Sequence, residues 1–265
     1  NAATFTATLN PNTALVYSSG YTIEVKGGST DPRVKDAAGN IMASNFTSTF
    51  ITQSTPPPSP VDGPGGPILV ISSTENPFSQ YPAEILRAEG FNAFAARDIS
   101  DITQTPTLVN SYDVIILGEI TLSAANVTTL TNWTNAGGTL IAFKPASQLA
   151  SLFGITPASG SLSDKYLRIN PTGPGAGIVN ETIQFHGTAN LYTLNGATSL
   201  ANLYSDASTA TNNPAVTTRN VGTNGGKAIA FTYDLAKSIV YTRQGNPAWA
   251  GQKRDGQIDP IRSDD

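Results

Sequence analysis

The chain has 265 residues, of which 13 % are charged, and a net charge of −4. This length is sufficient for two domains that each bury a core of ordinary size. The weak negative charge gives no electrostatic reason to bind phosphate backbones, and no apolar run reaches the roughly 20 residues of a spanning helix. The sequence therefore predicts no nucleic-acid partner and no membrane-spanning segment. Its richness in Thr, Ser, Asn, Ala and Gly is typical of secreted or cell-surface bacterial proteins.

Two residue types that carry much catalytic chemistry are scarce. The chain contains no cysteine, which excludes disulfides, Cys-based zinc sites, iron–sulfur clusters and thiol nucleophiles. Its one histidine, His186, cannot form a multi-histidine metal site. We therefore predict no cofactor and name no metal ligand, although a calcium site built from oxygen ligands stays open.

Residues 1–52 alternate apolar and polar side chains, as half-buried antiparallel strands do. The segments TLNPNTALVYSSGYTIEVKGG and VKDAAGNIMASNFTSTFIT resemble the second half of a bacterial Ig-like domain of surface-layer and large secreted proteins. Such a sandwich needs about seven strands, so the resemblance implies that this one is incomplete. We expect neighbouring domains or subunits to complete it through the N-terminal strands. The apolar positions are Phe5, Ala7, Leu9, Tyr21, Ile23, Val25, Phe46 and Phe50.

A different pattern follows a Pro- and Gly-rich linker at residues 53–67. From residue 68 to 242, short apolar runs alternate with helical segments, and residues 243–265 form an irregular tail. The runs 114–117 and 139–143 flank a helix that Ser123 can cap, which predicts a right-handed βαβ unit with parallel strands. We therefore predict an α/β domain with a doubly wound, mainly parallel sheet, preceded by the small, incomplete all-β Ig-like sandwich.

The order of motifs in the second domain also suggests a family. The segments ILVISS, AEGFN, YDVIILGE and LTNWTNAGGTLIAF resemble the class I glutamine-amidotransferase-like domain, nearest to its non-catalytic versions in β-galactosidases and other large secreted bacterial proteins. The resemblance implies a flavodoxin-like fold. Catalytic members carry a cysteine on the tight turn after a central strand, where this chain has Lys144-Pro145-Ala146. Glutamine hydrolysis is therefore excluded.

Several side chains are candidates for ligand binding. Glu75, Glu119 and Lys144 follow three predicted parallel strands, so they are expected to meet at one edge of the sheet and hold a polar ligand. The alternative is a solvated rim with a weak Glu–Lys ion pair. His186 could bind a ligand or simply hydrogen-bond within the fold. Trp249, in the Arg-containing tail, could stack on a glycan or pack on its own domain.

Two functions are compatible with these observations. The first is a non-catalytic extracellular structural or recognition module of a large secreted or surface protein, which could self-assemble by strand complementation. The missing cysteine nucleophile favours this hypothesis. The alternative is a secreted carboxylate-dependent hydrolase that acts on a glycan or amide. Glu75 and Glu119 would then perform acid–base chemistry, which requires a separation of about 5 to 10 Å on a glycan.

Overall fold

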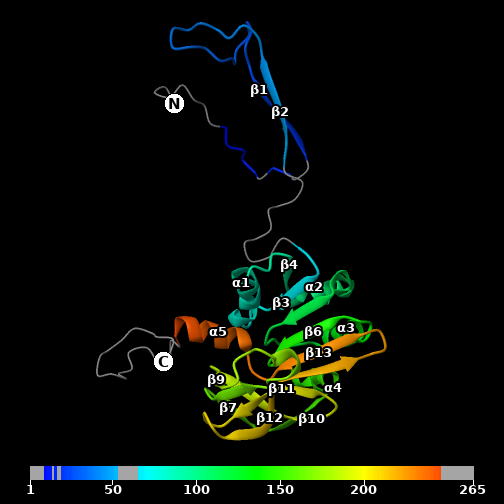
Figure 1. Ribbon diagram of the computed structural model, residues 1–265. Coiled ribbons are helices and arrows are strands. Elements are labelled where there is room, and N and C mark those ends of the chain that lie inside the picture. Colours follow the sequence, from blue (N-terminus) through cyan, green and yellow to red (C-terminus); the bar gives the residue numbers. More distant parts are fainter. Residues whose placement is uncertain (1–8, 14, 17–18, 53–64, 246–265) are drawn as a thin grey trace, which may run out of the picture. The chain divides into compact units, whose positions relative to one another are not determined.

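The computed structural model describes residues 9–13, 15–16, 19–52 and 65–245. The chain divides into two compact units, residues 1–58 and residues 59–265, and each is described by itself. Figure 1 shows a strand pair in the first unit and a sheet flanked by helices in the second. Among the described residues, every helix is too short or too polar to cross a membrane.

The first unit contains an antiparallel strand pair, β1 (Gly20–Val25) and β2 (Phe46–Ile51). The rings of Tyr21 and Phe50 stack across the pair with centroids 5.8 Å apart. The turn before β2 depends on Asp36, whose Oδ1 accepts hydrogen bonds from the backbone N–H groups of Ala38 and Asn40. Both strands lie where the alternating pattern predicts them. The predicted strand at Phe5 and Ala7 lies outside the described residues.

The second unit begins with strands and helices that alternate along the chain. Ser123 caps α3 as the sequence predicts, because its Oγ accepts a hydrogen bond of 3.1 Å from the backbone N–H of Asn126. The elements of this half are β3 (Ile68–Ser72), η1 (Pro77–Gln80), α1 (Tyr81–Ala88), β4 (Phe94–Asp98), α2 (Ile99–Gln104), η2 (Pro106–Ser111), β5 (Val114–Leu117), α3 (Ala124–Asn135) and β6 (Thr139–Phe143).

The rest of this unit is dominated by strands joined by tight turns. One such turn depends on Asp206, whose Oδ1 accepts hydrogen bonds from the backbone N–H groups of Ser208 and Thr209. The elements are η3 (Ser147–Leu149), α4 (Ala150–Phe153), β7 (Ile155–Ser163), β8 (Tyr166–Ile169), η4 (Gly173–Gly175), β9 (Thr182–Gln184), β10 (Thr188–Leu194), β11 (Thr198–Tyr204), β12 (Ala210–Val221), β13 (Gly226–Phe231) and α5 (Leu235–Gln244).

The main sheet is mixed, and the predicted doubly wound, mainly parallel, flavodoxin-like sheet is wrong. In the described part of the chain it has nine strands in the order β4-β3-β5-β6-β13-β12-β11-β8-β9. The strands from β4 to β13 pair in parallel, whereas β12, β11, β8 and β9 pair antiparallel. A second sheet pairs β7 with β10. Tight turns join β11 to β12 and β12 to β13, and such reversals produce antiparallel neighbours instead of helical crossovers.

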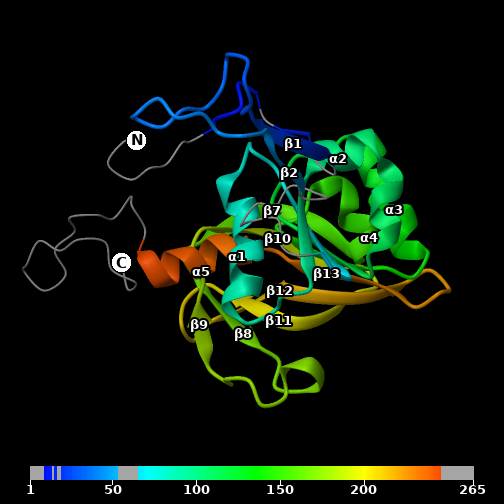
Figure 2. The same cartoon turned by 90° about the horizontal axis from the view of Figure 1, so that it is seen from above.

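Helices cover both faces of the parallel part of the sheet. Side chains alternate along β3, so that Leu69 and Ile71 join the large core beneath α2 and α3, and Val70 joins a smaller core beneath α1. Figures 1 and 2 place α1 and α5 on one side of the sheet and α3 on the other. Because both faces are covered, β3, β5 and β6 are almost entirely apolar, and polar residues follow them at the strand ends.

Candidate functional site

A crevice lies where the chain reverses its direction of travel across the sheet. From β3 the chain moves outward to β4 and then returns to β5 on the other side of β3. In sheets of this kind, ligands bind outside the carboxyl ends of the strands at such a switch point. The crevice has a volume of about 670 Å³, within the range of small-molecule sites. Its lining consists of Glu75, Asn76, Glu119, Ile120, Thr121, Leu122, Lys144, Pro145, Ala146, Ser147, Gln148, Asn190 and Tyr192.

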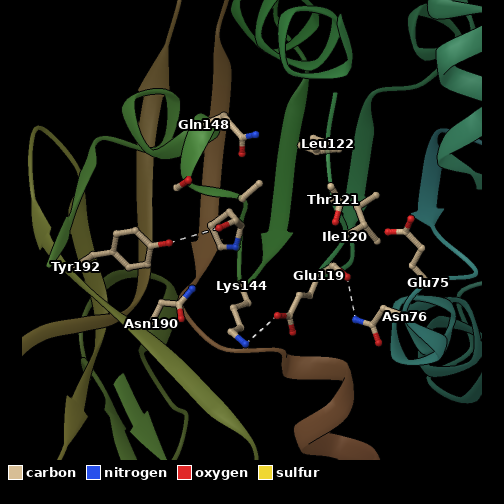
Figure 3. A pocket seen from close by; sticks show the side chains of 13 residues that line it. Glu75, Asn76, Glu119, Ile120, Thr121, Leu122, Lys144, Gln148, Asn190 and Tyr192 are labelled. Atoms are coloured by element: carbon tan, nitrogen blue, oxygen red, sulfur yellow. Dashed lines mark hydrogen bonds and ion pairs between the residues drawn. The ribbon is translucent and has the colours of Figure 1, made fainter. Parts of the chain in front are cut away.

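An ion pair joins the ends of the two central strands. The Nζ of Lys144, directly after β6, lies 2.8 Å from the Oε1 of Glu119, two residues after β5 (Figure 3). The Lys144 side chain is 19 % exposed and that of Glu119 is 37 % exposed, so water screens the pair only partly. The two groups therefore present a fixed donor and a fixed acceptor on one wall of the crevice.

Lys144 has an unusual backbone conformation. Its φ is 44°, in the left-handed region, which costs a residue with a Cβ about 1 to 2 kcal/mol. The backbone N–H of Lys144 donates a 2.7 Å hydrogen bond to the carbonyl of Phe231, which holds the turn in place. Backbone strain of this kind concentrates at functional sites, where the surrounding structure maintains it.

The loop after β3 is fixed against the loop after β5. Asn76 donates from Nδ2 to the carbonyl of Glu119 at 2.8 Å and accepts at Oδ1 from the N–H of Phe78. The buried Ser79 accepts at Oγ from the N–H of Ser73, and this bond closes the loop. Glu75 lies between these anchors. Figure 3 shows its carboxylate on the opposite side of the crevice from Tyr192 and Asn190.

The far wall comes from β10, and sequence reasoning did not single it out. Tyr192 is 3 % exposed, and its hydroxyl donates to the carbonyl of Pro145 at 3.4 Å. Burial raises the pKa of the Tyr192 hydroxyl, so this group is a hydrogen-bond donor at neutral pH. The Nδ2 of Asn213 donates to the carbonyl of Tyr192 at 2.9 Å and anchors the strand. Asn190, Asn76 and Gln148 add amide groups that both donate and accept hydrogen bonds.

A third carboxyl group lies near Glu119 without lining the crevice. Asp234 caps α5, because its Oδ1 accepts a 3.0 Å hydrogen bond from the backbone N–H of Lys237. Its Oδ2 is buried and has no hydrogen-bond partner in the described part of the chain. Burial raises the pKa of Asp234, and the negative charge of Glu119 raises it as well. The hydrogen bond from the backbone N–H of Lys237 lowers it.

His186, a further predicted ligand residue, does not line this crevice. His186 is buried elsewhere, with its Nδ1 3.9 Å from the Oδ1 of Asp164 and its backbone N–H donating to the Oγ of Ser238. Burial lowers the pKa of His186, while Asp164 opposes that shift. Trp249 lies outside the described residues. The crevice thus gathers Glu75, Glu119 and Lys144, and their binding of a ligand stays a prediction.

Comparisons with known proteins bear on both units. A family model described as a bacterial Ig-like domain matches residues 1–52, which confirms the Ig-like prediction for this segment. No curated protein sequence matches the chain significantly. A β-galactosidase from Rahnella sp. R3 matches with a TM-score of 0.51 and 17 % identity, over 65 % of this chain and 29 % of its own. A β-galactosidase from Bacillus circulans sp. alkalophilus matches with a TM-score of 0.50 and 10 % identity, over 66 % of this chain and 30 % of its own.

These matches bear on two predictions. The chain spans less than a third of either β-galactosidase, and at such low identity the likeness shows a shared fold alone. None of these comparisons supports the amidotransferase-like resemblance. The prediction of a non-catalytic structural or recognition module that assembles by strand complementation is corrected by this finding, since the solved structures that share the fold are β-galactosidases.

Proposed function

We propose that this protein acts on glycans and that the crevice of the second unit holds the saccharide. The observation that carries the proposal is the gathering of two carboxylates, one lysine and three side-chain amides around one cavity at the switch point. Carboxylates accept hydrogen bonds from sugar hydroxyls, an ammonium donates them, and amides do both. The fold shared with part of a β-galactosidase supports this assignment.

Hydrolysis is the reaction that the charged residues suit best. Cleavage of a glycosidic bond uses one carboxyl group to protonate the leaving oxygen and a second to activate water or attack the anomeric carbon. Glu75 and Glu119 are the carboxyl groups of the crevice lining. Glu75 protonates the leaving oxygen, and Glu119, held by Lys144, activates water or attacks the anomeric carbon. The two groups must lie about 5 to 10 Å apart for this chemistry.

The location of the protein forms part of the same proposal. Bacterial Ig-like domains of the matched type occur in surface or secreted proteins. We therefore assign this chain to the cell surface or the secreted fraction, where glycans are accessible. We also place the domain boundaries at residues 52, 68 and 242. We expect further domains or subunits to contact the N-terminal strands.

The proposal is tested by measuring both binding and turnover. The purified protein is titrated calorimetrically with a panel of oligosaccharides, and released reducing ends are assayed over the same panel. We expect binding of at least one glycan, and we expect Glu119→Gln to abolish any turnover. Glu84→Gln, on the exposed surface of α1, is the matched control because it removes the same charge outside the crevice. Failure of every glycan to bind, or turnover that survives Glu119→Gln, would contradict the proposal.

A further inference from the structure

The charges that line the crevice do not balance. Its described lining contains two acidic side chains, Glu75 and Glu119, and one basic side chain, Lys144. Lys144 and Glu119 neutralise each other at 2.8 Å. Glu75 has no ion-pair partner among the described residues. One negative charge is therefore left uncompensated in a cavity of otherwise uncharged polar and apolar groups.

The loop that carries this charge is held by hydrogen bonds. Asn76, the next residue, is tied to the carbonyl of Glu119, and the backbone N–H of Glu75 donates to the Oγ of Ser73 at 3.2 Å. The Glu75 side chain is exposed to solvent at the crevice. A carboxylate on a fixed loop loses less freedom on binding than one on a mobile loop, so it is well prepared to recognise a cation.

The negative charge of Glu119 also acts on a buried carboxyl group, that of Asp234. The buried carboxyl of Asp234 has a raised pKa, to which the charge of Glu119 contributes after burial itself. The negative charge of Glu119 is therefore felt by a neighbouring carboxyl even though Lys144 pairs with it. The negative charges of Glu119 and Glu75 would repel an anion bound in the crevice. The same charges would attract a bound cation.

We infer that the saccharide held in the crevice carries a free amino group, which pairs as an ammonium with the Glu75 carboxylate when it binds. This inference rests on the proposed function and specifies its substrate class. In the bound complex Glu75 is ionised and accepts the ammonium hydrogen bonds, and it takes a proton from that ammonium before it protonates the leaving oxygen. An N-acetylated sugar lacks the charge, and a uronic acid brings a carboxylate that Glu75 repels.

Three tetrasaccharides of equal length distinguish these classes. The probes are β-1,4-linked glucosamine, its fully N-acetylated form and galacturonic acid, titrated calorimetrically at a pH where the amine is protonated. We expect the amine to bind about fivefold more tightly than its acetylated form, the effect of ~1 kcal/mol from one partly exposed ion pair. The uronate should bind most weakly. The preference should shrink at high salt, because salt screens the pair.

Two variants test whether Glu75 is responsible. Glu75→Gln should equalise the amine and its acetylated form, and Glu84→Gln should leave the preference unchanged. Lys144→Asn should increase the preference, because it leaves Glu119 unpaired while Asn tolerates the left-handed backbone. If Lys144 only maintained the local structure, Lys144→Asn would weaken the binding of all three saccharides equally. That result would contradict the inference, and so would a preference that survives Glu75→Gln.

Failure of this inference can be told apart from failure of the proposed function. If neutral or acidic saccharides bind at least as tightly as the amine, the amino-sugar assignment is wrong and glycan binding stands. If none of the three binds and no other glycan does, both are wrong.

Discussion

Replacing Gly118 by alanine should disturb the crevice from behind, because this glycine lies between β5 and Glu119. A Cβ at Gly118 would lie 2.6 Å from the Cβ of Ser79 and 2.8 Å from its Cα. Carbon atoms prefer separations of 3.5 to 4.0 Å, so one of the two loops must move by about 1 Å. Ser79 is 1 % exposed and bound through its Oγ to Ser73, so it cannot retreat freely.

The expected magnitude follows from two opposing terms. Overpacking of this kind costs about 1 to 3 kcal/mol, whereas alanine gains about 0.4 to 1 kcal/mol over glycine by restricting the unfolded chain. The net loss of unfolding free energy should be ~1 to 2 kcal/mol, or about 2 to 4 °C in Tm for each kcal/mol in a unit of this size. Glycan affinity should fall as well, because the displaced loop carries Glu75 and Asn76.

Urea denaturation and calorimetric glycan titration of the same variant measure the two effects. Gly20→Ala is the matched control, because a Cβ at Gly20 meets nothing within 4 Å. Its stability should stay within ~0.5 kcal/mol of the parent. If Gly118→Ala is as stable as the parent and binds glycan equally well, the packing of Ser79 against β5 does not position the site.

Three further predictions concern Lys144, Asp234 and His186. Lys144→Gly should be more stable than Lys144→Ala by about 1 kcal/mol in urea denaturation, because only glycine relieves the left-handed backbone. Burial raises the pKa of Asp234, so its contribution to stability is largest below pH 3.8 and is lost as the pH rises through its pKa in the folded protein. Asp234→Asn should remove this pH dependence when the unfolding free energy is measured over a series of pH values. The single histidine signal in an NMR titration should give a pKa below 6.5 for His186, whose contribution to stability is complete above pH 6.5 and declines on acidification.

Each of these predictions has a contradicting result. Equal stability of the Lys144 glycine and alanine variants would mean that the turn stores no strain. A pH dependence that is unchanged in Asp234→Asn would assign the effect to another carboxyl group. A pKa of His186 at or above 6.5 in the NMR titration would mean that the charge of Asp164 outweighs the burial of the imidazole.

The sequence predicts the near wall of the crevice but not the far one. Glu119 and Lys144 could be placed together because each follows a short apolar strand, and the carboxyl ends of parallel strands meet at one edge. Tyr192 could not be placed, since it comes from β10, whose pairing with β7 shifts register between Asn190 and Tyr192. Local sequence does not determine which hairpin packs beside which strand.

The error in fold class has a related cause. β13, with the sequence GKAIAF, pairs in parallel with β6. Its other neighbour, β12, is antiparallel and leads into the rest of the hairpins. An apolar run predicts burial, not the direction of the strand beside it. The error in function arose because a missing cysteine excludes thiol chemistry without excluding carboxylate chemistry.

The central claim, that the crevice holds a saccharide, is tested most directly by mapping amide chemical shifts of the labelled protein during titration with a glycan that binds. We expect the perturbed amides to cluster at residues 75–76, 119–122, 144, 146–148, 190 and 192, which line the cavity. Perturbations confined to another surface, or spread without a cluster, would contradict it.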